Sequence, residues 1–189
     1  LELGADDVDL DRLRTGAPAE ASSFTGRAGP AHPAYVMFTS GSTGRPKGVS
    51  VPNEAVGEQL RWMQDHYRLT GDDAVLVRTS AGFDLSVWEY WWALSCGARI
   101  VLAEEGLERD GAGLRRAFAD HAITVLPTVP SALAMVLDAG PLPASVRSVL
   151  CIGEELPAAL VRRLADDGSP AVVHNLYGPT ECAVRDTDH

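Results

Sequence analysis

The chain has 189 residues with 26 acidic and 16 basic side chains, which gives a formal net charge of -10. A length of ~100–200 residues is typical of one domain with its own core, and the negative charge argues against a nucleic-acid or anionic-membrane surface. Its three separated cysteines favour neither a disulfide framework nor a zinc site, and no apolar run approaches the ~20 residues of a membrane helix, so we expect a soluble, cytoplasmic protein.

Composition divides the chain into two segments. Residues 1–32 are rich in Ala, Gly and Asp, and we expect a connector with at most one short acidic helix. Residues 33–189 alternate short apolar stretches with amphipathic ones, which predicts an α/β domain whose mostly parallel sheet is flanked by helices. The expected strands lie near 35–39, 74–78, 99–102, 123–126, 147–151 and 171–175, and the expected helices near 52–66, 86–95, 111–121, 130–138 and 157–166.

A loop of small polar residues follows the first expected strand, which the apolar run from Tyr35 predicts to be buried. Residues 39–48 are Thr-Ser-Gly-Ser-Thr-Gly-Arg-Pro-Lys-Gly. The three glycines, the last of them Gly48, allow positive φ, so that backbone N–H groups can converge on an anion, while hydroxyls and Lys47 add donors and charge. A Walker A loop does not fit, because Lys47 follows Pro46 and precedes Gly48. A polyphosphate is the expected ligand of this loop, although an ordinary Gly/Ser turn has a similar composition.

The most aromatic segment, residues 83–92, is Phe-Asp-Leu-Ser-Val-Trp-Glu-Tyr-Trp-Trp. Most of it fits an amphipathic core helix with Ser86 near the amino-terminal cap. Asp84 is harder to explain, since a carboxylate beside an apolar helix is costly to bury unless a cation or several donors satisfy it. The α-ammonium group of a substrate would be such a partner.

A polar cluster, Asn-Leu-Tyr-Gly-Pro-Thr-Glu, occupies residues 175–181 after an apolar stretch. Ligands of an open parallel sheet gather at the carboxyl ends of its strands, so this cluster is well placed for chemistry. A turn built on Gly178 and Pro179 explains the composition equally well.

These three segments, in this order, resemble the signatures of one family. The loop at residues 39–48 is similar to the phosphate loop of adenylate-forming enzymes, which include acyl-CoA synthetases, luciferases and the adenylation domains of nonribosomal peptide synthetases. Phe-Asp-x-Ser-Val-Trp-Glu and Asn-x-Tyr-Gly-Pro-Thr-Glu resemble motifs of the amino-acid-activating adenylation domains. The resemblance covers nearly all of residues 33–185 and implies part of the large N-terminal portion of such a domain.

The resemblance implies an ATP site. Asn175 would meet the adenine edge, Tyr177 would stack on the base, and Gly153 would let the backbone approach it. Lys47, Thr180 and Glu181 would be catalytic, with Glu181 as a ligand of Mg²⁺, a cation that prefers hard oxygen donors and phosphates. The full set implied for the nucleotide is Thr39, Ser40, Gly41, Ser42, Thr43, Gly44, Lys47, Gly153, Asn175, Tyr177, Gly178 and Thr180.

The resemblance also implies an amino-acid site in which Asp84 holds the amino group. The implied pocket walls are Leu85, Trp88, Pro127, Leu150, Ile152, Leu176, Val184 and Arg185. The family often has glycine where Ile152 stands, so we expect a shallow pocket. Arg185 could pair with an acidic substrate side chain, or it could be a solvated surface arginine.

The implied reaction is attack of an amino-acid carboxylate on the α-phosphate of ATP, then transfer of the acyl group to a phosphopantetheine thiol on a peptidyl carrier protein. The rest of the adenylation domain and an MbtH-like protein are the other implied partners. Because the family places further catalytic groups beyond residue 189, we expect little activity from these residues alone. Two alternatives stay open: an acyl- or aryl-CoA ligase of the same superfamily, and a non-catalytic scaffold segment of an interrupted adenylation domain.

Overall fold

The computed structural model describes residues 28–40, 45–104, 106–180 and 187–188. Its core is a sheet whose five parallel strands lie in the order β4-β3-β5-β6-β7. These strands are β3 (Ala74–Val77), β4 (Arg99–Leu102), β5 (Val125–Thr128), β6 (Ser148–Cys151) and β7 (Val172–Tyr177). The short β8 (Thr187–Asp188) pairs antiparallel with β7. The predicted α/β class with a mostly parallel sheet is therefore confirmed.

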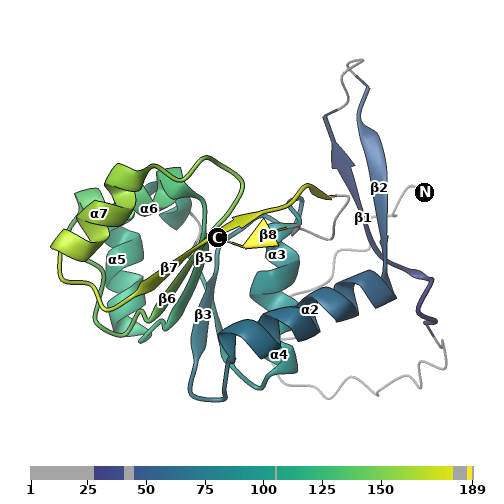
Figure 1. Ribbon diagram of the computed structural model, residues 1–189, viewed down its shortest axis with the longest axis horizontal. Helices are drawn as coiled ribbons and strands as arrows, with labels where there is room; N and C mark the ends of the chain where they lie inside the picture. The colour runs from purple at the N-terminus through teal and green to yellow at the C-terminus, as the bar shows by residue number, and fades with distance from the viewer. Residues whose placement is uncertain (1–27, 41–44, 105, 181–186, 189) are drawn as a thin grey trace.

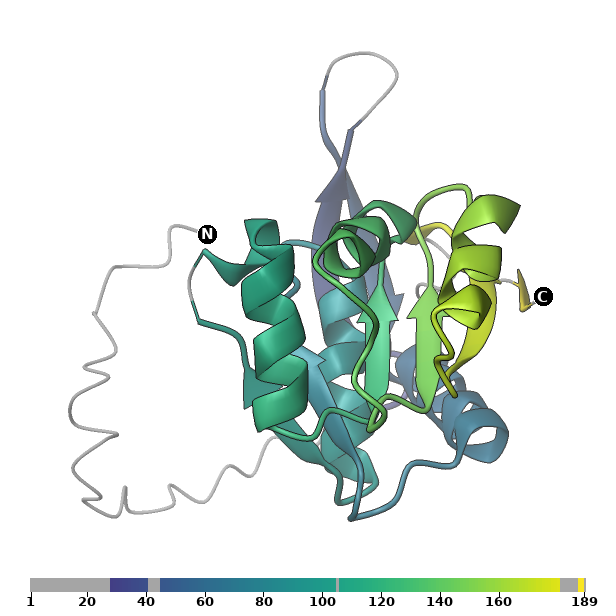
Figure 2. The same cartoon turned by 90° about the vertical axis from the view of Figure 1, so that its left-hand side faces the viewer.

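Helices cover both faces of this sheet (Figure 1, Figure 2). One face carries α5 (Gly111–Asp120), α6 (Pro130–Asp138) and α7 (Ala158–Asp166), and a short 3-10 turn, η2 (Leu107–Arg109), precedes α5. The other face carries α2 (Asn53–Tyr67) and an aromatic segment made of α3 (Leu85–Val87), the π-helix η1 (Trp88–Trp92) and α4 (Ala93–Ser95). In the part of the chain that the structure describes, no helix is long and apolar enough to cross a membrane.

Two hydrophobic cores follow from the alternation of the strand residues. Successive side chains of a strand point to opposite faces. Leu76 and Val149 accordingly pack in the core beneath α5, α6 and α7, whereas Val75 and Leu150 pack in the core beneath α2 and the aromatic segment. A residue's position in its strand therefore decides which helices it contacts.

The strand order brings the predicted motifs to one edge of the sheet. The chain passes from β3 to its neighbour β4 and then returns to β5 on the other side of β3. Ligands of such sheets bind outside the carboxyl ends of the strands, near the point where the order reverses. Residues 78–84 follow β3, residues 152–156 follow β6 and residues 178–180 follow β7, so all three segments leave the sheet at this edge.

The first strand differs from its prediction. β1 (Pro33–Thr39) does not join the main sheet but forms an antiparallel two-stranded hairpin with β2 (Lys47–Pro52), a strand that the sequence pattern did not predict. The expected burial of β1 is wrong, since Phe38 is 72% exposed. Gly48 pairs with Phe38 inside the hairpin and does not have the positive φ expected for it. The hairpin projects from the rest of the described structure (Figure 1).

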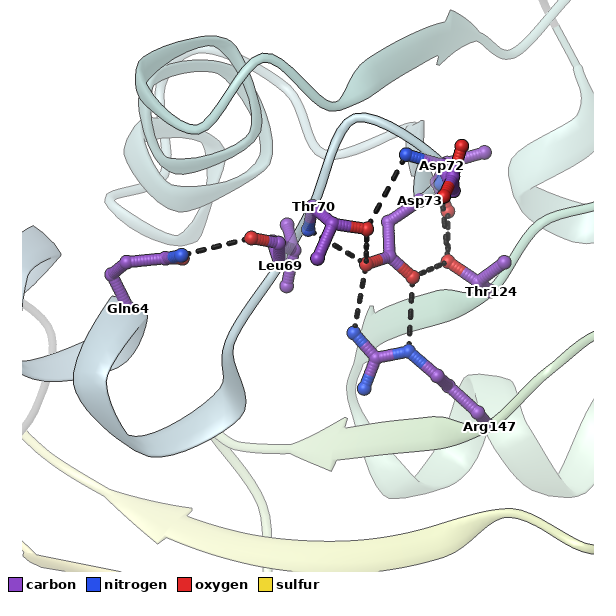
Figure 3. Close-up of polar contacts among 8 residues, drawn as sticks. Gln64, Leu69, Thr70, Asp72, Asp73, Thr124 and Arg147 are labelled. Carbon is purple, nitrogen blue, oxygen red and sulfur yellow. Dashed lines mark hydrogen bonds and ion pairs between the residues drawn. The ribbon is translucent and has the colours of Figure 1, made fainter.

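A buried carboxylate, Asp73, joins three strands at the opposite, amino-terminal edge (Figure 3). Arg147 donates to both of its oxygens, from Nε at 2.9 Å and Nη2 at 3.0 Å. Thr124 Oγ1 donates to Oδ1 at 2.6 Å and the Thr70 backbone N–H donates to Oδ2 at 2.9 Å. Burial alone would raise the pKa of Asp73, but these hydrogen bonds and the charge of Arg147 outweigh it and lower the pKa to about 2. The network therefore stabilises the starts of β3, β5 and β6.

We expect Asp73→Asn to lower the free energy of unfolding of the intact protein at pH 7 by about 1–3 kcal/mol, because Arg147 loses its anionic partner but remains partly exposed to water. The pKa of Asp73 lies below its ordinary value of 3.8. The carboxylate therefore contributes fully to the free energy of unfolding above pH 3.8, and this contribution disappears as the pH falls toward about 2. Urea denaturation at a series of pH values measures both effects.

Asp72→Asn is the matched control for this prediction, because Asp72 is the exposed neighbour of Asp73. It should change stability by less than about 0.5 kcal/mol. The role of the carboxylate would be contradicted if the difference in the free energy of unfolding between wild type and Asp73→Asn stayed constant as the pH fell from about 6 to about 2.

Candidate nucleotide and substrate site

An open pocket of about 530 Å³ lies at the carboxyl ends of β6 and β7. Four positions predicted for the nucleotide line it: Gly153, Asn175, Tyr177 and Gly178. They meet because β6 and β7 are adjacent and parallel, with Cys151 paired to Asn175. Segments more than twenty residues apart in sequence thus form one concave surface, of a size that suits a nucleoside.

Backbone and ring geometry in this pocket suit a flat, polar base. Gly153 has φ +86°, a backbone conformation that residues other than glycine rarely adopt. The next residue, Glu154, accepts hydrogen bonds of 2.8 Å from the backbone N–H and from Oγ of Ser131, which ties this turn to the start of α6. Tyr177 is exposed, so one face of its ring is free for stacking.

The hairpin brings the two ends of the predicted phosphate loop together. Thr39 and Lys47 are cross-strand partners, and Lys47 is exposed. Ser40 follows β1 and is exposed as well. Gly41, Ser42, Thr43 and Gly44 lie outside the described residues, as do Glu181, Val184 and Arg185. Thr180 is half-buried directly after the pocket residues 178 and 179.

Asp84 stands at the amino-terminal end of the aromatic segment and is half-buried. The turn that leads to it is hydrogen-bonded, since the Phe83 N–H donates to the Ser80 carbonyl at 2.9 Å and Ser86 Oγ donates to the Phe83 carbonyl at 2.7 Å. Burial, followed by the negative charge of Asp84, raises the pKa of Tyr35 to about 12. The buried Tyr35 hydroxyl finds no hydrogen-bond partner among the described residues. No sequence motif predicts a role for Tyr35 in the site.

Five of the predicted pocket walls pack in one hydrophobic core. They are Leu85, Trp88, Leu150, Ile152 and Leu176, contributed by α3, η1, β6 and β7 and the residue after β6. Leu176 also lines the nucleotide pocket. Pro127, in the neighbouring strand β5, is buried and pairs with Leu150. These described residues, which the family resemblance groups as substrate walls, are therefore neighbours in space, and Leu176 joins them to the nucleotide pocket.

Glu89, which had no predicted role, anchors the segment that carries Asp84. It is fully buried in the π-helix η1, and one carboxylate oxygen accepts the backbone N–H groups of Arg78 and Thr79 at 3.0 and 2.9 Å. The other oxygen accepts the Thr79 hydroxyl at 2.6 Å. Burial raises the pKa of Glu89, although hydrogen bonds from Thr79 and Arg78 oppose that shift. Arg78 in turn donates to Thr128 at 2.7 Å, which links the ends of β3 and β5.

The spacing of the sequence contained a signal for Glu89. Leu85, Trp88, Glu89 and Trp92 recur at positions typical of one helix face, and all four are buried. A carboxylate on an otherwise apolar face needs donors. Pattern analysis alone could have marked Glu89 as a buried acceptor, but it could not have identified Thr79 as its partner.

Comparison with known proteins shows the family of the chain. The family model described as AMP-binding enzyme matches residues 4–187. The chain belongs to the AMP-binding enzyme family. Its predicted relationship to adenylation domains is confirmed by curated relatives and by solved structures.

Two relatives of the AMP-binding chain illustrate the match. Enterobactin synthase component F of Escherichia coli O157:H7 is 44% identical over 189 residues, covering 95% of this chain and 14% of that protein. Tyrocidine synthase 3 of Brevibacillus parabrevis is 41% identical over 183 residues, covering 96% of this chain and 3% of that protein. The chain thus spans a small part of the length of these relatives.

Solved structures match the fold of the AMP-binding chain over most of its length. The nonribosomal peptide synthetase FmoA3 gives a TM-score of 0.80 at 26% identity, over 87% of this chain and 18% of that one. The Vibrio cholerae adenylation domain AlmE, solved in complex with glycyl-adenosine-5'-phosphate, gives 0.78 at 29% identity, over 86% of this chain and 31% of that one.

Proposed function

We propose that this chain supplies the nucleotide pocket and the amino-acid anchor of an adenylation domain in a nonribosomal peptide synthetase. The reaction is attack of an amino-acid carboxylate oxygen on the α-phosphorus of ATP, with pyrophosphate as the leaving group and an aminoacyl-adenylate as the product. The observation that carries the proposal is the pocket at the ends of β6 and β7, where Gly153, Asn175 and Tyr177 converge within a chain of the AMP-binding family.

Two groups of described residues bind the two substrates, one group the adenine of ATP and the other the amino acid. Tyr177 stacks on the adenine and Asn175 contacts its polar edge, while the glycine at 153 lets the backbone come close. Asp84 holds the α-ammonium group, and the substrate side chain lies against the adjacent apolar core. Because the two halves share Leu176, they bring the carboxylate and the α-phosphate together, which lowers the entropic cost of the reaction.

Groups of the hairpin and of the segment after β7 interact with the negative charge of the phosphates. Lys47 and the hydroxyls of Thr39 and Ser40 donate to phosphate oxygens, and Thr180 contacts the phosphate beside the base. Glu181 and Thr180 offer the hard oxygen chemistry that suits Mg²⁺. When bound, Mg²⁺ would neutralise charge that develops on the phosphates.

The intact protein would then pass the acyl group to a phosphopantetheine thiol on a peptidyl carrier protein. An MbtH-like protein and the rest of the adenylation domain are further proposed partners. Within the chain, we propose residues 1–32 as the connector and residues 33–189 as part of the adenylation core.

Amino-acid-dependent exchange of pyrophosphate into ATP by the intact protein tests this function. We expect exchange with at least one proteinogenic or related amino acid and none with the matching carboxylic acid that lacks the amino group. Equal exchange with both would favour an acyl- or aryl-CoA ligase. The absence of exchange with every amino acid, in a protein that still binds ATP, would favour a non-catalytic scaffold.

A further inference from the structure

The walls of the proposed amino-acid pocket that belong to the described core have almost no accessible surface. Trp88 is 1% exposed, Leu150 0%, Ile152 4% and Leu176 3%. Leu85, next to the proposed ammonium anchor, is 7% exposed. A cavity wide enough for a water molecule would leave accessible surface on the side chains around it. These side chains therefore fill the space that they surround instead of enclosing a deep pocket.

Ile152 belongs to this core together with Leu176, which itself lines the nucleotide pocket. Its N–H donates to the Thr128 carbonyl at 3.0 Å, which extends the pairing of β5 and β6 by one residue. Two-residue alternation places Ile152 on the same face as Leu150, beneath α3 and η1, while Cys151 packs in the other core. Gly153, the next residue, lines the nucleotide pocket. The branched side chain of Ile152 thus packs in the core that contains Trp88, one residue before the base-binding turn.

We propose that the substrate of this site is an amino acid with a small side chain, of the size found in glycine, alanine or serine, and that Ile152 sets this limit. The inference rests on the adenylation function proposed above. A larger side chain would have to displace residues of a close-packed core, and packed cores resist added methylene groups. A small side chain adds few atoms beside the ammonium group, and Asp84 is half-buried and keeps accessible surface for that group.

A size series of amino acids tests the limit in the intact protein. Pyrophosphate exchange is measured with glycine, alanine, serine, valine, leucine and phenylalanine. We expect kcat/KM for the best of the first three to exceed that for leucine and phenylalanine by at least about 100-fold, since single methylene groups change such ratios by about 10–200-fold. A preference for leucine or phenylalanine overturns the size limit but leaves the adenylation function intact. Exchange with no amino acid overturns both.

The assignment of the limit to Ile152 has its own test. Ile152→Ala should raise kcat/KM for valine or leucine relative to alanine by about 10-fold or more, because it removes side-chain volume from the core that contains Trp88. Cys151→Ala is the matched control, since it removes side-chain volume from the adjacent residue, which packs in the other core. It should leave the relative preference unchanged. Equal shifts in the two variants, or none in Ile152→Ala while that protein keeps exchange with alanine, overturn the role of Ile152.

Discussion

Replacement of Asp84 by Asn should lower kcat/KM for the amino acid by about 100- to 1,000-fold in the intact protein, because loss of one partner of a buried charge pair leaves the substrate ammonium group uncompensated. Asp84 is the carboxylate placed beside the proposed side-chain pocket, at the start of the aromatic segment. The loss should appear mainly as a higher KM for the amino acid, whereas the KM for ATP should change little. Pyrophosphate exchange at varied concentrations of both substrates measures the two effects separately.

Asp72→Asn makes the same chemical change at an exposed position before β3 and should leave both kinetic constants near their wild-type values. An equal loss for ATP and the amino acid in Asp84→Asn would point to a general structural defect. An unchanged kcat/KM would remove Asp84 from the substrate site.

Replacement of Glu89 by Ala should lower the free energy of unfolding by about 3–5 kcal/mol, because it opens a cavity in the core and leaves two partly buried backbone N–H groups and one hydroxyl without their acceptor. The donors belong to Arg78 and Thr79. Glu89→Gln keeps the shape and one acceptor oxygen, so its effect should be smaller. Urea denaturation of the intact protein measures the difference.

A positioning role for Glu89 predicts a kinetic effect as well. Since residues 78–84 connect its hydrogen-bond donors to Asp84, Glu89→Gln should raise the KM for the amino acid more than the KM for ATP. Glu58→Gln, a matched change at an exposed site on α2, should affect neither stability nor KM. A loss below about 1 kcal/mol in Glu89→Ala would show that the three hydrogen bonds are replaced by water or by other groups.

Much of the fold could be predicted because its elements carry local signals. Helix α6 was predicted with its observed bounds, and α5 to within one residue, since apolar spacing and a proline or glycine mark their ends. The hairpin could not be predicted in the same way. β2 is short and contains glycine and proline, and residues 40–46 connect it to β1 without the tight-turn sequence that identifies most hairpins. The apolar residues of β1 therefore resembled a buried strand of the main sheet.

In the candidate site, too, only part of the arrangement could be predicted from local sequence patterns. The residues proposed for the nucleotide and the substrate could be named from motifs, and the structure brings Gly153 and Tyr177 into one pocket. The groups that hold the site and sheet together could not be named. Asp73 and Arg147 are 74 positions apart, and the partners of Glu89 depend on how η1 packs against the end of β3. Such pairings follow from the tertiary fold and have no local sequence pattern.

The most direct test of the central claim is a crystal structure of the intact protein with a non-hydrolysable aminoacyl-adenylate analogue. We expect the adenine against Tyr177 and Gly153, the ammonium group on Asp84, and the substrate side chain in contact with Ile152. An adenine bound away from the ends of β6 and β7, or an ammonium group that does not contact Asp84, would contradict the claim.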